Sequence, residues 1–253
     1  MAHDLRLFRE QRGQTGHDVA KIINCARSSV SRLETGQAKL EDRQAAVLDE
    51  EWNTGGHFTY QLWYARLGHN PNWLQEHLDI EARSSVIKTY EALVVPGLLQ
   101  TPEYARALFA ADGVADVEGD VERRMSRQAI LTKNPPPQLW VLLSENALDW
   151  PIGSPKVMRL QLAGLLEASE QPHIGIRVLP RSAGAHAGTT GSFKIMSTDS
   201  GDIVYTDSPG GGRLVPSVAE VRSYALRYDR IGQHALPEGA SRDKIKQAME
   251  ATQ

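Results

Sequence analysis

The sequence contains a single cysteine, Cys25, and therefore offers neither an internal disulfide nor a cysteine-rich zinc site. It also lacks a long apolar run, since stretches such as residues 139–143 fall far short of the roughly 20 residues that a membrane-spanning helix needs. Charged side chains within the first ten residues leave no apolar core for a secretory signal. We therefore expect a cytoplasmic protein in a reducing compartment, with no membrane as partner.

The chain has no overall excess of positive charge, because its 28 basic and 31 acidic side chains give a formal net charge of −3. The basic residues are unevenly placed, however. Residues 1–39 contain seven basic and four acidic side chains, a balance of +3 that leaves −6 for the remainder. No acidic residue lies between Val19 and Leu33. We therefore expect an anionic partner to bind this segment, which carries Lys21, Arg27 and Arg32.

Apolar periodicity at the N-terminus predicts a bundle of short helices. Residues 4–12 and 41–51 each read as an amphipathic helix. Between them, residues 16–35 fit two short helices joined by a tight turn. Ala20 is small enough for a close crossing of these helices, and Asn24 tolerates the left-handed conformation that such a turn needs. The polar face of the second helix carries serines and arginines and could face a DNA groove.

The segment from Ser28 to Gly36, SSVSRLETG, resembles the recognition helix of the xenobiotic-response-element class of helix-turn-helix proteins. In that class the second helix lies in the major groove of DNA, and its N-terminal residues reach base edges. The base contacts that the resemblance implies are Arg27, Ser28, Ser31 and Arg32. The phosphate contacts that it implies, around the following loop, are Thr35, Lys39 and Arg43.

Two positions depart from the pattern of that class. Ala26 stands where Ser or Asp usually caps the recognition helix, which should cost about 1 kcal/mol. Gly16 stands where a Gln usually contacts the DNA. We therefore expect modest affinity from one copy. The alternative is a helical bundle with incidental arginines on a solvated face, but Ala20, Asn24 and Val30 together favour DNA binding.

The rest of the chain predicts a larger domain of helices and strands. Turn-forming residues at 53–56 suggest a joint, so we expect a helix-turn-helix domain over 1–51, a linker over 52–60 and a second domain over 61–253. Helical patterns cover residues 61–82 with a break at Asn70-Pro71, 101–111, 120–133, 156–168, 218–228 and 242–251, the last capped by Ser241. Strand-like runs cover residues 85–93, 138–144, 174–179, 192–197 and 202–206. The aromatic residues expected in the core are Trp63, Tyr64 and Trp73.

These patterns predict an α+β fold class for the whole chain. An all-α N-terminal domain is followed by a mixed α+β domain with a small, largely antiparallel sheet. Three motifs in the second domain, VPGLLQTPEYA at 95–105, AGAHAG at 183–188 and GSF at 191–193, resemble the C-terminal module of WhiJ-like regulators from actinobacteria. The function of that module is unknown. The resemblance implies a transcriptional regulator, often encoded beside a small partner protein.

No short motif indicates catalysis. The ionisable candidates are Glu91, Glu145, His173, His186 and Asp207, and nothing in their spacing forces them to converge. His173 and His186 lack a nearby cysteine or a spaced third ligand, so no metal site is predicted. His186, between two predicted strands, is the best candidate for contacting a ligand, although a loop histidine without chemistry is the simpler explanation. We expect no enzymatic activity and no cofactor.

Three functions are compatible with the sequence. The first is a sequence-specific DNA-binding regulator that binds operators as a homodimer and senses a small molecule or a partner protein. Dimerisation is expected because two or three base contacts of about 1–3 kcal/mol each discriminate weakly at one half-site. The second is an antitoxin-like module that neutralises a small neighbouring protein and autoregulates its operon. The third, an enzyme with a DNA-binding head, has no motif in its favour.

Overall fold

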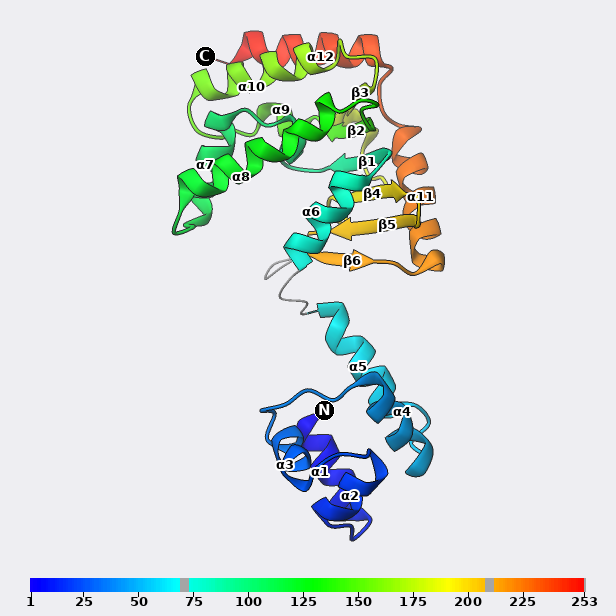
Figure 1. Cartoon of the computed structure of the whole chain (residues 1–253). Coiled ribbons are helices and arrows are strands. Elements are labelled where there is room, and N and C mark those ends of the chain that lie inside the picture. Colours follow the sequence, from blue (N-terminus) through cyan, green and yellow to red (C-terminus); the bar gives the residue numbers. More distant parts are fainter. Residues whose placement is uncertain (69–72, 208–211, 253) are drawn as a thin grey trace. The chain divides into compact units, whose positions relative to one another are not determined.

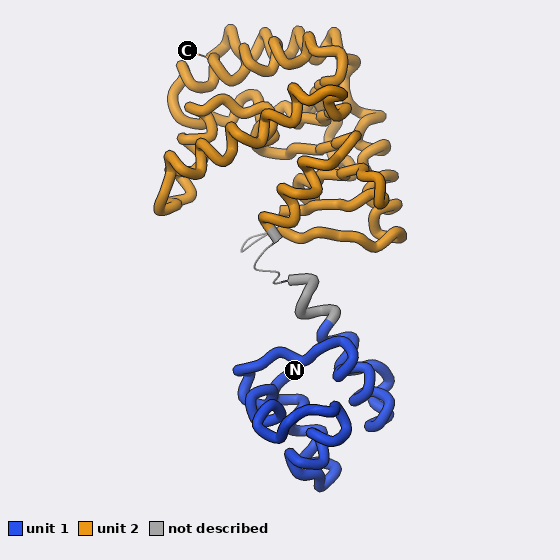
Figure 2. Tube along the Cα trace, viewed as in Figure 1, with its two compact units in different colours: residues 1–71 blue, residues 72–253 orange. Residues whose placement is uncertain are grey.

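A computed structural model describes residues 1–68, 73–207 and 212–252 of the chain, with only the backbone described for residues 63–68 and 73 (Figure 1). The chain divides into two compact units, Met1–Pro71 and Asn72–Gln253 (Figure 2). Each unit has a hydrophobic core of its own. Within the described ranges, none of the helices has the length and apolarity that crossing a membrane requires.

The first unit is a bundle of short helices, as the periodicity predicted. Its helices are α1 (Ala2–Gln11), α2 (Gly16–Ile22), α3 (Arg27–Glu34), α4 (Asp42–Glu51) and α5 (His57–Gly68). Each contributes apolar side chains to one core, which includes Leu5, Val19, Val30, Leu48 and Phe58. The bundle holds the α2–turn–α3 segment on a scaffold of three further helices.

The first unit extends further along the chain than we expected. Trp52, Phe58 and Leu62 all pack into its core, and the indole Nε1 of Trp52 donates a hydrogen bond of 2.9 Å to Oε1 of Gln14. Residues 52–60, the predicted linker, therefore belong to the first unit, and so does α5. The glycines at 55 and 56 have positive φ angles of 67° and 91°. They form the turn between α4 and α5, and nothing local indicates that the next helix packs back onto the bundle.

The second unit confirms the α+β class. Its sheet consists of β1 (Val86–Glu91), β2 (Gln138–Ser144), β3 (Ile174–Leu179), β4 (Phe193–Thr198), β5 (Gly201–Thr206) and β6 (Arg213–Val215). The strand order is β3-β2-β1-β4-β5-β6. The junctions from β1 through β4 and β5 to β6 are antiparallel, as expected for most of the sheet, whereas β1–β2 and β2–β3 are parallel. The sheet is therefore mixed.

Helices cover both faces of this sheet. One face packs Ile87, Leu139 and Val141 against α10 (Pro155–Ala168) and α12 (Glu238–Ala251). The opposite face packs Tyr90, Leu142 and Ile195 against α11 (Val218–Gly232). The remaining elements are α6 (Trp73–Arg83), α7 (Pro102–Asp112), α8 (Val117–Arg127), α9 (Asn146–Asp149) and the short 3-10 helices Gly97–Leu99, Gln128–Thr132 and Arg181–Ala183.

Several boundaries differ from the predicted ones. The helix expected over 120–133 is α8 followed by a 3-10 turn, and the three-residue strand β6 was not predicted. The last helix begins at Glu238, so Ser241 does not cap it. Instead the Ser241 hydroxyl accepts a hydrogen bond from Val178 N (2.9 Å) and donates one to Leu236 O (3.2 Å). The predicted break at Asn70-Pro71, and the side chains of Trp63, Tyr64 and Trp73, lie outside what the structure describes.

Candidate nucleic-acid interface

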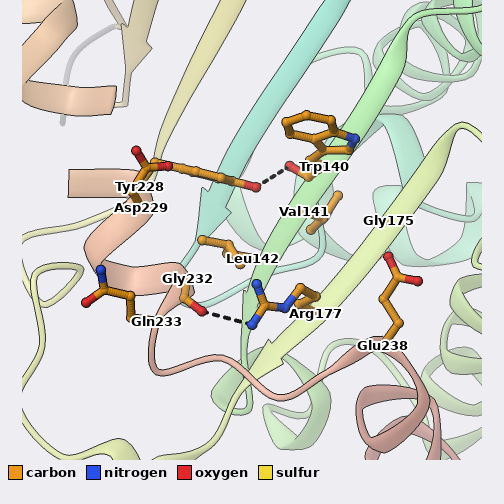
Figure 3. A pocket seen from close by; sticks show the side chains of 10 residues that line it. All are labelled: Trp140, Val141, Leu142, Gly175, Arg177, Tyr228, Asp229, Gly232, Gln233 and Glu238. Carbon is orange, nitrogen blue, oxygen red and sulfur yellow. Dashed lines mark hydrogen bonds between the residues drawn. The ribbon is translucent and has the colours of Figure 1, made fainter. Parts of the chain in front are cut away.

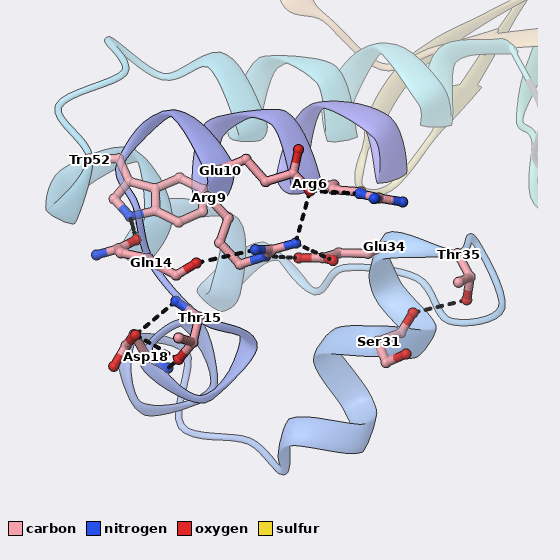
Figure 4. Close-up of polar contacts among 10 residues, drawn as sticks. All are labelled: Arg6, Arg9, Glu10, Gln14, Thr15, Asp18, Ser31, Glu34, Thr35 and Trp52. Carbon is pink, nitrogen blue, oxygen red and sulfur yellow. Dashed lines mark hydrogen bonds and ion pairs between the residues drawn. The ribbon is translucent and has the colours of Figure 1, made fainter.

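The candidate interface is built on α2, α3 and the turn between them. Thr15 caps α2, because its hydroxyl accepts from Asp18 N (3.3 Å) while the Asp18 carboxylate accepts from Thr15 N (2.8 Å) (Figure 4). The turn contains Asn24, whose φ of 49° is left-handed as predicted. Ala20 is buried, as its place at the helix crossing requires. The sequence pattern therefore identified the helix-turn-helix geometry correctly.

The second of these helices has one buried and one exposed face. Val30 and Leu33 are buried in the core of the first unit. The four predicted base contacts all lie on the other side, where they are exposed: Arg27, Ser28, Ser31 and Arg32. A β-carbon added at Gly16 would lie 3.9 Å from Cγ of Arg27, so the first turns of α2 and α3 are neighbours. The exposed face of α3 therefore starts beside α2 and carries two arginines.

The predicted phosphate contacts differ in how free their polar groups are. Lys39 and Arg43 are exposed, and within the described ranges neither has an ion-pair partner. Thr35 is also exposed, but its hydroxyl donates a hydrogen bond of 2.9 Å to Ser31 O in the last turn of α3 (Figure 4). Thr35 would have to break this bond before it could donate to a phosphate.

Three of the seven basic residues before position 40 are held by the fold. Arg9 forms a two-bond ion pair with Glu34, with its Nε and Nη2 at 2.6 and 3.1 Å from the carboxylate, and links α1 to the end of α3 (Figure 4). Arg12 lies over the rings of Phe8 and Trp52, at 5.2 and 5.3 Å from their centres. The third, Arg6, pairs with Glu10 at 2.8 Å.

These pairings concentrate the free positive charge at α2 and α3. Glu34, the acidic residue at the end of α3, is turned inward to Arg9, and 13% of its side chain is exposed. The exposed cations Lys21, Arg27 and Arg32 have no ion-pair partner in the described part of the chain. Charge counting treated all seven basic residues alike. Nothing in the local sequence reveals the long-range Arg9–Glu34 pair, so the charge count could not exclude Arg9 from the free cations.

The missing cap of α3 gives a stability prediction. Ala26 occupies the N-cap position with extended backbone angles (φ −74°, ψ 148°) and, as predicted, no side-chain cap. Ala26→Ser should raise the free energy of unfolding of the first unit by about 1 kcal/mol, because the hydroxyl can accept from an unpaired helix N–H. Amide hydrogen exchange in α3 measures the gain. In the matched control Ala46→Ser, at an exposed position inside α4, stability should fall slightly instead.

The ligand candidate His186 closes a turn. Its Nδ1 accepts a hydrogen bond of 3.0 Å from Gly188 N, and its ring makes an edge contact with Tyr90 at 6.0 Å. Burial lowers the pKa of His186, so the neutral form that accepts this bond is favoured. The geometry therefore gives His186 a local structural contact and leaves its role toward a ligand an untested expectation.

Of the other ionisable candidates, Glu145 makes contacts of its own, whereas Glu91 and Asp207 lie close enough to interact electrostatically. Glu145 accepts from Lys244 Nζ and from Arg181 N, each at 2.8 Å. Glu91 accepts from the Thr89 hydroxyl at 2.9 Å, and burial raises its pKa to about 7. Asp207 accepts from the Tyr205 hydroxyl. Among the described residues, there is no cluster of three or more side chains suited to holding a metal ion.

Comparison with known protein families gives two matches. A helix-turn-helix domain matches residues 1–50, and a domain of unknown function, DUF5753, matches residues 74–247. Comparisons with curated proteins and with solved structures found no match. The helix-turn-helix match indicates DNA binding and transcription regulation as the role of the first unit.

Proposed function

Because the chain belongs to the DUF5753 family and carries a helix-turn-helix domain, we propose that it is a sequence-specific DNA-binding regulator of transcription in the cytoplasm. We assign it to the xenobiotic-response-element type and to the WhiJ-like group of actinobacterial regulators, as its motifs suggest. The observation that carries the proposal is the exposed face of α3, where Arg27 and Arg32 lie without acidic partners among the described residues.

In this proposal α3 enters the major groove. Arg27 and Arg32, with Ser28 and Ser31, contact base edges, since a guanidinium can donate two hydrogen bonds to guanine. Lys39 and Arg43 contact phosphates and fix the position of the helix without reading sequence.

Two copies are proposed to bind one operator. The exposed face of α3 offers few side chains for base contacts, and a good contact contributes about 1–3 kcal/mol, so a second half-site is needed for useful selectivity. The half-sites should lie about 34–36 Å apart, one helical turn of DNA, or a multiple of this distance.

The second unit is proposed to sense a small molecule or a protein partner and to have no catalytic role. Support comes from its ionisable candidates, of which Glu145 and His186 are engaged in local structural contacts. An antitoxin-like function differs in one respect: the second unit would then bind and neutralise a small neighbouring protein. A stable stoichiometric complex after co-expression with the adjacent reading frame would favour that function.

Gel-shift titration of the purified protein on the DNA upstream of its own gene tests the proposal, with and without the neighbouring protein. We expect a discrete complex that survives an excess of unrelated DNA. Binding that unrelated DNA competes away at equal concentration would contradict sequence specificity.

Lys39→Ala should weaken binding to every DNA sequence and leave base preference unchanged. A phosphate contact is insensitive to sequence, and its loss should flatten the plot of log affinity against log salt by about one unit. Fluorescence anisotropy at several salt concentrations measures both effects. Arg6→Ala is the matched control, because it also removes one positive charge but from a residue that pairs with Glu10 on α1. An equal effect of the two substitutions would exclude a specific phosphate contact at Lys39.

A further inference from the structure

The second unit contains a pocket on the sheet face that α11 covers. Its volume is about 540 Å³, which is within the range of sites for small ligands. Strands β2 and β3, the end of α11 and the start of α12 form its walls (Figure 3). His186 is not among the residues that line it.

An exposed indole and a glycine keep this pocket open. Trp140 lies on β2, an inner strand, yet it is 43% exposed. Its register partner on β3 is Gly175. A β-carbon at Gly175 would lie 3.1 Å from Oε1 of Glu238 and 3.7 Å from Cδ1 of Trp140. A side chain at this position would therefore fill the space between the indole and the carboxylate.

Arg177 places a fixed positive charge in the pocket. Its Nε donates to Leu236 O (3.0 Å), and its Nη2 donates to Gly232 O (2.9 Å) and Ala235 O (2.7 Å). These bonds to main-chain carbonyls hold the guanidinium in place. Nη1 has no hydrogen-bond partner and the side chain no acidic partner among the residues that the structure describes. It is an oriented donor to which a carboxylate can bind.

Two carboxylates line the same pocket. Asp229 on α11 and Glu238 at the first position of α12 are exposed, and neither has an ion-pair partner in the described ranges. In Figure 3, Arg177 lies between Glu238 on one side and Tyr228 on the other. The pocket thus offers one oriented cation, two anions and an aromatic surface.

This set of groups disfavours ligands of a single charge. A cationic ligand would be repelled by Arg177 and by Lys88, whose Nζ lies 5.0 Å from the centre of the Trp140 ring and 5.7 Å from that of Tyr228. An anionic ligand would be repelled by Asp229 and Glu238. A ligand that carries both a negative and a positive group can pair with the cations and with the carboxylates at the same time.

We propose that this pocket binds a small zwitterion with an aromatic or apolar group, of the size of an amino acid, and that the zwitterion is the effector of the regulator. Its carboxylate binds Nη1 of Arg177, its ammonium binds Glu238, and its apolar group packs on Trp140. The effector role rests on the proposed function, whereas the binding itself does not.

Isothermal titration calorimetry of the full-length protein without DNA tests whether the pocket binds a zwitterion. The probes are L-phenylalanine, 3-phenylpropionate, which lacks the ammonium group, and phenethylamine, which lacks the carboxylate. We expect L-phenylalanine to bind at least tenfold more tightly than either analogue. Equal affinities of the three probes, or no binding of L-phenylalanine at millimolar concentration, would overturn the proposal.

Two variants locate the site. Gly175→Val should abolish binding, because valine suits a strand but fills the pocket, whereas Gly239→Val, at an open position on α12, should not change it. Glu238→Gln should weaken the binding of L-phenylalanine by three- to tenfold. The affinity for 3-phenylpropionate should stay unchanged or increase. Retained binding in a folded Gly175→Val protein, as judged by circular dichroism, would refute the location.

Operator binding with and without L-phenylalanine tests the effector role separately. A reproducible change in operator affinity that Gly175→Val removes is the expected result. An unchanged operator affinity in protein that binds L-phenylalanine would rule out the effector role. Failure to bind DNA in the absence of any ligand, with L-phenylalanine binding intact, would instead contradict the proposed function and leave the pocket assignment standing.

Discussion

Replacing Arg27 by alanine should lower affinity for the operator by about 5- to 150-fold per half-site, the equivalent of about 1–3 kcal/mol for a specific base contact. Arg27 is the first residue of α3, is exposed and has no ion-pair partner among the described residues. Binding to unrelated DNA should change much less, because it depends on phosphate contacts. Competition titrations with operator and unrelated DNA measure the two affinities separately.

The controls for Arg27→Ala distinguish the loss of a base contact from the loss of one positive charge. Lys39→Ala should reduce both affinities by a similar factor, and Arg6→Ala should reduce neither appreciably. If Arg27→Ala lowers affinity for every sequence by the same factor, then Arg27 contacts the DNA backbone and the assignment of α3 as the base-reading helix loses its main support.

The largest effect on stability should come from Glu81, which is buried between α6, α8 and the sheet. Its carboxylate receives two hydrogen bonds from Arg127, at 2.9 and 3.1 Å, and pairs with Lys194 on β4. Lys194 is in register with Thr89 on β1 and with Tyr205 on β5, so the cluster is anchored on an inner strand of the sheet. Burial alone would raise the pKa of Glu81, but the charges of Lys194 and Arg127 outweigh it and lower this pKa to about 2.

Glu81→Ala should therefore lower the free energy of unfolding of the second unit by about 3–5 kcal/mol, because it leaves two cations without their shared partner. Urea denaturation followed by far-ultraviolet circular dichroism measures the loss. Glu118→Ala is the matched control. Glu118 also forms two bonds with an arginine, Arg106, at 2.6 and 2.8 Å, but at the surface, where the cost should be about 0–1 kcal/mol. Similar losses for the two variants would contradict the role assigned to burial.

Lowering the pH should remove the stabilisation that ionised Glu81 gives to the native protein. The folded-state pKa of Glu81 is depressed below its ordinary value of 4.5, so the stabilisation is complete above pH 4.5 and is lost as the pH falls toward 2. The stability difference between the native chain and Glu81→Ala should therefore shrink over this interval. A difference that stays constant down to pH 2.5 would contradict the depressed pKa of Glu81.

The parts of the fold that the sequence predicted are those with local causes. The α2–turn–α3 segment follows from Ala20, Asn24 and the spacing of Val30 and Leu33, all within 15 residues. The parallel pairing of β2 with both β1 and β3 depends on chain crossings through helices, which no local pattern specifies. Ser241 has the residue type of a helix cap, yet its hydroxyl bonds Val178 and Leu236, because the preceding Glu238 already starts the helix.

In the candidate sites, too, the sequence predicted the features that have local causes and missed those that depend on long-range contacts. The exposed residues of the candidate DNA interface were found because they belong to one short helix and its following loop. Arg9 was counted in the positive balance of residues 1–39, because its partner Glu34 lies 25 residues away and no local pattern reveals the pair. The zwitterion pocket was missed entirely, because Trp140, Arg177 and Glu238 come from three separate elements and are joined only by the strand register and the placement of α12.

Selection of binding sites from a random pool of double-stranded DNA tests the central claim, that α3 reads base sequence. The full-length protein and the Arg27→Ala variant are used in parallel, with folding verified by circular dichroism. We expect the native protein to enrich a pseudo-palindrome whose half-sites are about one helical turn apart or a multiple of it, and the variant to lose preference at one or two positions of each half-site. Recovery of no enriched sequence from the folded native protein would contradict the account.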